Sequence, residues 1–450
     1  MSRLEIDDYE PYVDDAGLVG LAVADQTLIE IKSLSEWKDE DKKLGEMLEK
    51  RLETLVKLFR FPFKPQVDEL DDDLHTDLTR YLAEHIWFSD DRYYSVLANW
   101  IICTWIQEQL THATRLCFYG PTNSGKTRAI KCLALLSYRG FHNITPTGPG
   151  LFRMIERYHV TMCLDELQDV QKEQRADIDL IIKGGFESGP GVARCNDKGE
   201  LDFFNVYGPM ALGTKHQPRE DIENRSLLVC MTQKPSDAEL GDRKIKRKVD
   251  QEEAGKLRGR LLALRLQVLS GKVDLVPFIA KADEMAQASL LQDGIEGREV
   301  FLDDRSIDKA SELLVPGVMF KDCDSTLELL AQSENDASQG LRETLEAKIF
   351  FALQAVYAPV SMNGAIIKVC DPKTMSQKDV TDQLREDFGQ IGDEDEPPKT
   401  RTVGRILRLL GFRFKQGHSR ASMFDATTFQ QAYDANLRKY GMRRGDDDEK

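Results

Sequence analysis

Apolar positions recur at helical spacing along the first hundred residues. Leu44, Leu48, Leu52 and Leu55 repeat every three or four positions, which predicts an amphipathic helix within residues 40–59. The preceding residues are acidic and mixed and predict a short pair of strands. Residues 93–110 are almost continuously apolar, which indicates a helix buried against a larger unit.

Between residues 114 and 231 the pattern changes to short apolar runs that alternate with helical stretches. The runs RLCFYG, VTMCLDE, GPMALGT and RSLLVCM are separated by segments with helical spacing. This order of strand, crossover and strand predicts an α/β fold, with a parallel sheet covered by helices. Two extended runs flank the turn NDKG and predict a hairpin, with Lys198 at its tip and Arg194 on its arm.

Residues 234–340 have the pattern of helices with charged faces, and we expect no sheet there. Further along, a helical wheel places one apolar side opposite a basic side that carries Arg401, Arg405 and Arg408. Thr400 is expected to cap the start of this helix and Gly411 its end.

The stretch FRFKQGHSRASMF follows this helix and predicts a basic two-stranded wing. Its cationic side chains are Arg413, Lys415 and Arg420. A helix followed by a basic hairpin is the order of a winged helix, whose arginine face can lie against DNA phosphates. A solvated amphipathic helix is the alternative.

Composition limits the classes of partner. The formal net charge of −16 argues against a protein whose whole surface binds nucleic acid, so any such contact must use local basic faces. The 8 cysteines are scattered, without metal-binding spacing, and indicate a reducing compartment. No apolar signal segment and no membrane-spanning stretch are apparent, so we expect a cytoplasmic protein without membrane contact.

The stretch GPTNSGKT matches the phosphate-loop pattern G-x-x-x-x-G-K-[ST], after a predicted strand and at the start of a predicted helix. Its glycines let backbone N–H groups surround a polyphosphate at a helix N-terminus. Lys126 would reach the terminal phosphates, and Thr127 would offer a hydroxyl to Mg²⁺. The expected nucleotide-binding residues are Gly120, Thr122, Asn123, Ser124, Gly125, Lys126 and Thr127.

Carboxylates follow a second apolar strand. Asp165 is placed to hold Mg²⁺, and Glu166 is placed to polarise the attacking water, as phosphoryl transfer requires. An acidic turn at a strand end is the alternative. A third strand ends at Thr214, which would lie beside the nucleotide and contact the γ-phosphate or the water; a solvated threonine is the alternative there.

Taken in order, these segments resemble a known family. The likeness rests on NWIICTW, GPTNSGKTR, CLDE, GGFESGPGVARC, FFNVYGPMALGT, IENRSLLVCM, LDDRSIDKASELL and RTVGRILRLLGFRFK, and it extends from about Tyr94 to Tyr433. The chain resembles the uncharacterised P-loop ATPase domain fused to primases of phages, plasmids and integrated elements. That domain is itself similar to the superfamily-three hexameric helicases of the AAA+ class.

The resemblance implies an ATP- and Mg²⁺-dependent ATPase that assembles as a hexameric ring of identical subunits. It implies that Arg225 acts on a neighbouring subunit's nucleotide and that Arg305 contacts nucleotide. An ordinary surface arginine paired with Glu223 is the alternative for Arg225. In a ring, Lys198 and Arg194 would point into the channel and hold a nucleic-acid backbone; an ordinary edge hairpin is the alternative.

Two departures accompany the resemblance. The related helicases usually carry Asn where Thr214 stands. In addition, no acidic triad of a primase is apparent upstream of the expected ATPase. A separate primase or another element-encoded protein is therefore an expected partner. The expected domains are an arm (1–60), a helical region (61–112), the P-loop ATPase core (113–233), a helical lid (234–340), a winged helix (341–436) and a tail (437–450).

Three functions compete at this level. The first is an ATP-driven motor on single-stranded or duplex DNA, such as a ring helicase or translocase. The second is an ATP-dependent DNA-binding initiator, loader or regulatory switch that does not unwind DNA. The third, a small-molecule or nucleotide kinase, leaves Asp165–Glu166, Arg225 and the basic C-terminal unit without a purpose.

Overall fold

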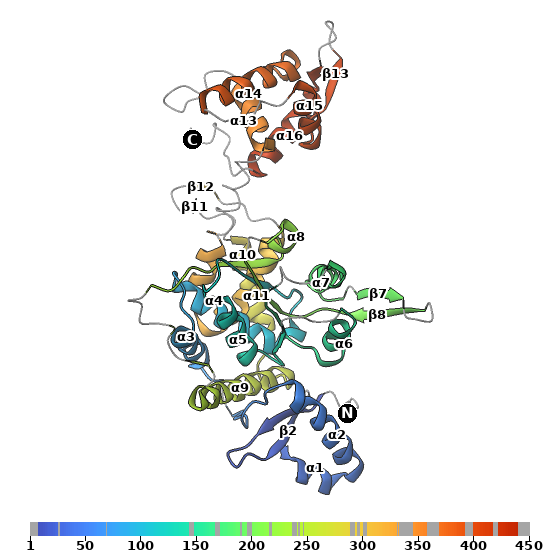
Figure 1. The fold of residues 1–450 in the computed structure, drawn as a ribbon, viewed down its shortest axis with the longest axis vertical. Coiled ribbons are helices and arrows are strands. Elements are labelled where there is room, and N and C mark those ends of the chain that lie inside the picture. Colours follow the sequence, from blue (N-terminus) through green and yellow to red (C-terminus); the bar gives the residue numbers. More distant parts are fainter. Residues whose placement is uncertain are drawn as a thin grey trace. The chain divides into compact units, whose positions relative to one another are not determined.

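Two units make up the chain (Figure 1), Met1–Ser289 with Asp303–Leu330 and Leu290–Leu302 with Ala331–Lys450. The structure is a computed structural model. It describes residues 8–25, 28–68, 70–143, 148–166, 172–189, 191–195, 200–215, 218–235, 241, 244–245, 247–288, 293–294, 298–299, 304–330, 332, 345–357, 369–391, 399–416 and 422–439.

A five-stranded parallel sheet forms the centre of the larger unit. Its strands are β4 (Arg115–Tyr119), β5 (Phe141–Asn143), β6 (Met162–Leu164), β9 (Met210–Thr214) and β10 (Ser226–Cys230). They lie in the order β10-β4-β9-β6-β5. Apolar runs such as LCF in β4 are fully buried, as expected for a parallel sheet with both faces covered. The predicted α/β fold with a P-loop core is confirmed.

Helices surround this sheet. They are α3 (Leu74–His85), α4 (Arg92–Trp105), α5 (Lys126–Leu136), α6 (Gly148–Tyr158), α7 (Lys172–Gly184), α8 (Glu220–Glu223), α9 (Lys248–Leu269), α10 (Val276–Ala288) and α11 (Asp304–Phe320), with the short η2 (Gln107–Gln109). The apolar stretch before the phosphate loop is α4, which is buried along nearly its whole length, as its composition predicts. The hairpin strands β7 (Gly191–Cys195) and β8 (Leu201–Asn205) extend beyond α6 and α7 (Figure 1).

The N-terminal region is more regular than the sequence pattern predicts. It has three antiparallel strands rather than two, β1 (Glu10–Val13), β2 (Val19–Asp25) and β3 (Leu28–Ser33), followed by α1 (Leu34–Glu40) and α2 (Lys42–Leu58). The third strand was missed because LIEIKS is only partly buried and carries charges. The helix predicted within residues 40–59 is confirmed by α2.

A buried charge network joins this region to the helices around the central sheet. Glu10 accepts a hydrogen bond from the hydroxyl of Tyr138 (2.6 Å) and lies 3.1 Å from Arg139 and 3.2 Å from Arg265. Arg265 also pairs with Glu108 at 2.6 Å. Burial alone would raise the pKa of Glu10, but the two arginines and Tyr138 outweigh it and lower the pKa to about 2.

Glu10→Gln is expected to lower the free energy of unfolding at pH 7 by about 3–5 kcal/mol, because it removes the carboxylate partner of buried Arg139 and one of the two carboxylate partners of buried Arg265. The folded-state pKa of Glu10, about 2, is below the unfolded value of about 4.3. The contribution is therefore complete above about pH 5 and is lost as the pH falls toward 2. Urea unfolding across this pH range measures it; the exposed Glu46→Gln is the matched control, and equal loss in both variants would contradict the assignment.

The smaller unit is mainly helical. It contains α13 (Leu345–Tyr357), η4 (Pro372–Thr374), α14 (Gln377–Ile391), α15 (Thr400–Leu409), β13 (Phe414–Gln416), β14 (Ser422–Phe424) and α16 (Ala426–Lys439). Its core includes Phe350, Phe412 and Phe429. The order of helix α15 and the antiparallel pair β13–β14 is that of the predicted helix and wing.

Two details of the predicted elements differ. Thr400 is the first helical residue and Lys399 precedes it without a side-chain cap, whereas Gly411 ends the helix with φ 91° as predicted. The segment expected to have no sheet contains β11 (Asp293–Gly294) and β12 (Arg298–Glu299), a pair too short to produce a periodic signal. No helix in the described part of the chain is long and apolar enough to cross a membrane.

Candidate functional site

The phosphate loop joins β4 to α5 and depends on glycine at both ends. Gly120 (φ 147°) and Gly125 (φ 95°) have positive φ, and Asn123 (φ 66°) lies in the left-handed region that asparagine tolerates. A Cβ at Gly120 would stand 2.1 Å from the carbonyl oxygen of Met231. Gly125 precedes α5 without a side-chain cap, so the first N–H groups of the helix remain available for an anion.

Lys126 directs its ammonium group into the curve of this loop. Its Nζ donates to the carbonyl oxygens of Gly120 (2.8 Å) and Pro121 (2.7 Å) and to the hydroxyl of Ser124 (3.2 Å). Burial lowers the pKa of Lys126, although the nearby carboxylate of Asp165 opposes this effect. Neutral oxygens thus hold the ammonium, and charged phosphate oxygens would form stronger bonds with it.

The predicted carboxylates lie at the end of β6. Asp165 is buried, and its Oδ1 accepts a hydrogen bond from the N–H of Glu166 (3.0 Å). Glu166 is exposed and has φ 54°, a backbone conformation that costs a non-glycine residue of order 1–3 kcal/mol. Strained backbone conformations of this kind are frequent at functional sites, because contacts with the surrounding structure stabilise them there.

Gly213 makes room for Asp165, and sequence analysis missed it. A Cβ at Gly213 would stand 2.5 Å from Cδ1 of Ile130 and 2.7 Å from Oδ1 of Asp165. Because β9 lies between β4 and β6, this glycine lets α5 and Asp165 approach each other across the strand. The available signal was a glycine inside an apolar strand, which often marks such a close approach.

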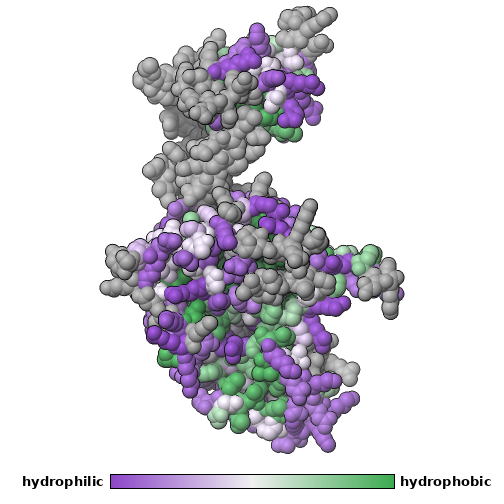
Figure 2. Space-filling view, in the orientation of Figure 1, coloured by the Kyte–Doolittle hydropathy of each residue, from purple (hydrophilic) through white to green (hydrophobic). Residues whose placement is uncertain are grey.

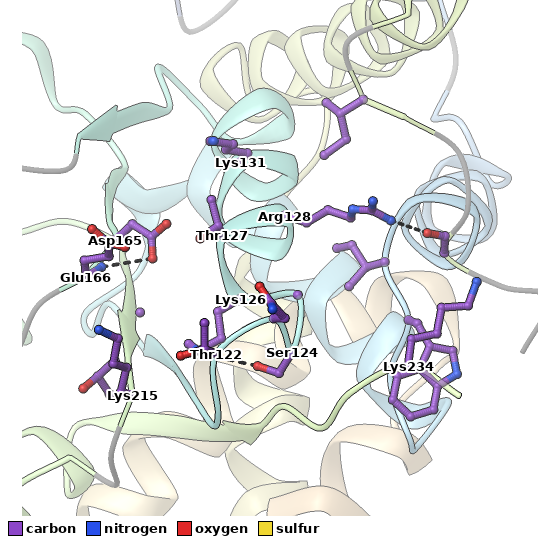
Figure 3. A pocket seen from close by; sticks show the side chains of 18 of the residues that line it. Thr122, Ser124, Lys126, Thr127, Arg128, Lys131, Asp165, Glu166, Lys215 and Lys234 are labelled. Atoms are coloured by element: carbon purple, nitrogen blue, oxygen red, sulfur yellow. Dashed lines mark hydrogen bonds between the residues drawn. The ribbon is translucent and has the colours of Figure 1, made fainter. Parts of the chain in front are cut away.

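A pocket of about 810 Å³ brings these parts together. The phosphate loop, Asp165, Glu166 and Thr214 all line it. Figure 3 shows Asp165, Glu166 and Lys215 on one side of the phosphate loop and Lys234 on the other. The lining residues that sequence analysis did not single out are Ile86, Trp87, Arg128, Lys131, Gly213, Lys215, Lys234, Gly241, Lys244 and Ile245.

Trp87 belongs to the pocket wall near Arg128 and Gly241. Arg128 donates from Nη1 to the carbonyl oxygen of Gly241, whose N–H donates to the carbonyl oxygen of Ala83 (2.9 Å). A Cβ at Gly241 (φ 77°) would stand 2.6 Å from the backbone nitrogen of Trp87. These contacts join three segments that are far apart in the sequence, around Trp87, Arg128 and Gly241. No local sequence motif predicts them.

Arg225 and Arg305 do not line this pocket. Ser226, next to Arg225, pairs with Arg115 at the start of β4, whereas the phosphate loop follows the end of β4. The five residues of β4 separate the start of the strand, near Arg225, from the phosphate loop at its end. At about 3.3 Å per residue this separation is roughly 15 Å. Arg305 is exposed at the start of α11, and Nζ of Lys309, one turn later, lies 3.5 Å from the carbonyl oxygen of Ser226.

In the described part of the β7–β8 hairpin, the predicted basic residue Arg194 is engaged by its own chain. Arg194 pairs with Asp177 of α7 (2.8 Å), and its guanidinium lies 4.6 Å from the ring centre of Phe152. On the other face of the ribbon, Leu201 and Phe203 are 60% and 70% exposed, and pale green marks this projection in Figure 2. Lys198 lies outside the described residues.

The arginines of α15 form an exposed face. Val403, Ile406 and Leu407 are buried on one side, while Arg401, Arg405 and Arg408 are exposed on the other. Arg413 is also exposed, and Lys415 is paired with Asp425 at 2.8 Å. Arg420 lies outside the described residues. The helical-wheel separation of charged and apolar sides is confirmed.

Comparisons with known proteins find distant likenesses. No protein-family model and no curated protein matches the chain. Among solved structures, the active helicase Cch of SCCmec type IV has a TM-score of 0.36 at 10% identity, covering 94% of both chains. The C-terminal region of NrS-1 has a TM-score of 0.35 at 10% identity, covering 92% of this chain and 96% of that one. Drosophila ORC bound to DNA has a TM-score of 0.20 at 13% identity, covering 86% of this chain and 99% of that one.

Proposed function

We propose that this protein is an ATP-hydrolysing motor on nucleic acid, a ring-forming DNA helicase or translocase of a phage, plasmid or other mobile element. The observation that carries the proposal is that the phosphate loop, Asp165 and Glu166 line one and the same pocket. A phosphate cradle with a buried and an exposed carboxylate beside it supplies what triphosphate hydrolysis needs. The mobile-element origin is what the sequence resemblance implies.

In this proposal the phosphates of ATP lie along the loop between β4 and α5. The N–H groups of the loop and of the first turn of α5 bind phosphate oxygens, and Lys126 exchanges its carbonyl partners for the terminal phosphates. Glu166 orients and polarises the attacking water. Trp87, Ile86 and Ile245 offer an apolar wall for the base.

The donors present fit Mg²⁺. A magnesium ion bound with a nucleotide takes oxygen ligands, usually one or two carboxylates together with phosphates. The Thr127 hydroxyl and the Asp165 carboxylate are such oxygens at this pocket, and Gly213 leaves space beside Asp165. When bound, the ion would neutralise phosphate charge.

Oligomerisation is part of the proposal because of where Arg225 lies. A residue at the opposite edge of the sheet from its own phosphate loop is badly placed for its own nucleotide. In a hexameric ring of identical subunits it would meet the neighbour's pocket and stabilise the charge of the transition state. Arg305 would approach the same neighbouring nucleotide from α11.

DNA is the proposed partner of the smaller unit. Arg401, Arg405 and Arg413 are exposed and make no ion pair with other described residues, so their charges are available to phosphates. The second candidate function, a DNA-binding initiator, loader or switch, is favoured by Arg194, whose pairing with Asp177 reduces the basic character of the hairpin. Such a switch would bind duplex DNA through α15 and hydrolyse ATP slowly.

The test is ATP hydrolysis by the purified full chain with and without single-stranded and duplex DNA. A motor is expected to raise its turnover several-fold with DNA, and Lys126→Ala is expected to abolish hydrolysis. Slow hydrolysis that is indifferent to DNA would favour the switch. Absence of any Lys126-dependent hydrolysis would overturn both readings.

DNA binding is tested in the same preparation. The triple variant Arg401→Ala, Arg405→Ala, Arg408→Ala is expected to weaken binding and to reduce the salt slope for duplex DNA by about 2–3, since each neutralised phosphate contributes ~0.9. The exposed lysines 42, 43 and 50 of α2, changed together to Ala, give a control of equal charge. Equal effects in both triple variants would mean that α15 is not the DNA surface.

A further inference from the structure

Strand β9 ends between the phosphate loop and the carboxylate pair. It pairs with β4 on one side and β6 on the other, and Thr214 lies opposite Tyr119, the residue before Gly120. Lys215 therefore follows at the level of the first loop residue. Its side chain is exposed and lines the pocket, on the same side of the loop as Asp165 and Glu166 (Figure 3).

The pleat of β9 gives Thr214 and Lys215 different directions. A Cβ at Gly213 would meet Ile130 of α5 and the carboxylate of Asp165, so position 213 faces the side of the sheet that α5 covers. Successive strand residues point to opposite faces. Thr214 therefore points away from α5 and is 9% exposed, whereas Lys215, directly after the strand, lines the pocket on the side of Asp165 and Glu166.

The electrostatics of the pocket agree with this placement. Lys126 and Lys215 are both cations that line this pocket, with the buried carboxylate of Asp165 beside them. Two cations that affect each other across a pocket repel, and an anion between them relieves the repulsion. The terminal phosphate of a nucleotide on the loop is such an anion.

We propose that Lys215, rather than Thr214, contacts the γ-phosphate and makes the pocket distinguish a nucleoside triphosphate from a diphosphate. This inference rests on the proposed function, because it requires a nucleotide whose phosphates lie on the loop. Lys126 approaches the terminal phosphate from α5 and Lys215 from the end of β9. Because a diphosphate has no γ-phosphate, contact with Lys215 strengthens binding of the triphosphate alone.

The test compares the binding of the magnesium complexes of AMP-PNP and ADP to the full chain, by calorimetry. Lys215→Ala is expected to weaken AMP-PNP binding by ~10–100-fold, the range of one hydrogen bond to a charged group, and to leave ADP binding unchanged. Lys215→Arg is expected to restore most of the preference, because it keeps the charge. A merely structural role would weaken both nucleotides together.

Two matched variants complete the experiment. Thr214→Val removes the neighbouring hydroxyl, and Lys256→Ala removes an exposed cation of α9 that does not line the pocket; both are expected to keep the wild-type ratio of the two affinities. The inference is overturned if Lys215→Ala leaves that ratio unchanged while wild-type binding depends on Lys126. If the wild type binds neither nucleotide in a Lys126-dependent way, the proposed function is overturned as well.

Discussion

Glu166→Gln is expected to bind ATP as tightly as the wild type but to hydrolyse it ~10²–10⁴-fold more slowly, the range for losing a group that handles the proton of the attacking water. The amide keeps the size of the side chain but cannot accept that proton. Glu166 is exposed in the pocket, so its replacement leaves the buried Asp165 and the phosphate loop in place. Phosphate release gives the rate, and binding of a fluorescent nucleotide gives the affinity.

Glu156→Gln on α6 is the matched control, because Glu156 is exposed and does not line the pocket. It should hydrolyse ATP at the wild-type rate. Hydrolysis by Glu166→Gln at that same rate would exclude Glu166 as the residue that activates the water. Loss of nucleotide binding in Glu166→Gln would instead assign the carboxylate to binding.

Arg225→Ala is expected to reduce hydrolysis by ~10³-fold or more, the effect of removing an arginine that stabilises the transition state, while nucleotide still binds. The physical reason is the distance between Arg225 and its own phosphate loop, which lie at opposite edges of the sheet. Mixing the Arg225→Ala and Glu166→Gln proteins should recover activity. In a mixed ring, one subunit supplies the arginine and its neighbour the intact pocket.

The rate of ATP hydrolysis, measured against the mixing ratio of the two variants, shows whether Arg225 acts on the neighbouring subunit. A maximum at intermediate ratios supports an arginine that acts between subunits, whereas the plain sum of two inactive proteins argues against it. Arg219→Ala is the control. Arg219 lies between β9 and β10, as Arg225 does, but it pairs with Asp179 of its own chain at 2.8 Å. This variant should stay near the wild-type rate.

The local motifs were the part of the site that sequence analysis could find. The stretch GPTNSGKT predicts a loop whose geometry follows from two glycines and the start of a helix. The strand that precedes Asp165 and Glu166 lies in the same sheet as the strand before this loop. Parallel strands place their carboxyl ends at one edge, so motifs that are distant along the chain meet there. The roles of these residues stay predictions.

The rest of the site could not be predicted because it depends on contacts between separate segments. Trp87 and Gly241 adjoin only after α3 and the chain before α9 have packed against α5. Arg194 appears as a free cation in the sequence, and only the approach of Asp177 from α7 shows that it is paired. The direction of Lys215 depends on the pleat and register of β9, which the apolar run alone does not define.

By itself the sequence determined the α/β class, the phosphate loop, the two carboxylates after β6 and the separation of apolar and arginine sides on α15, because each is encoded in short-range spacing. Tertiary structure alone decided that Gly213 admits Asp165, that Lys215 faces the pocket and that Arg225 lies at the opposite edge of the sheet. Strand order and register create these relations, and both arise from packing between residues far apart in the chain.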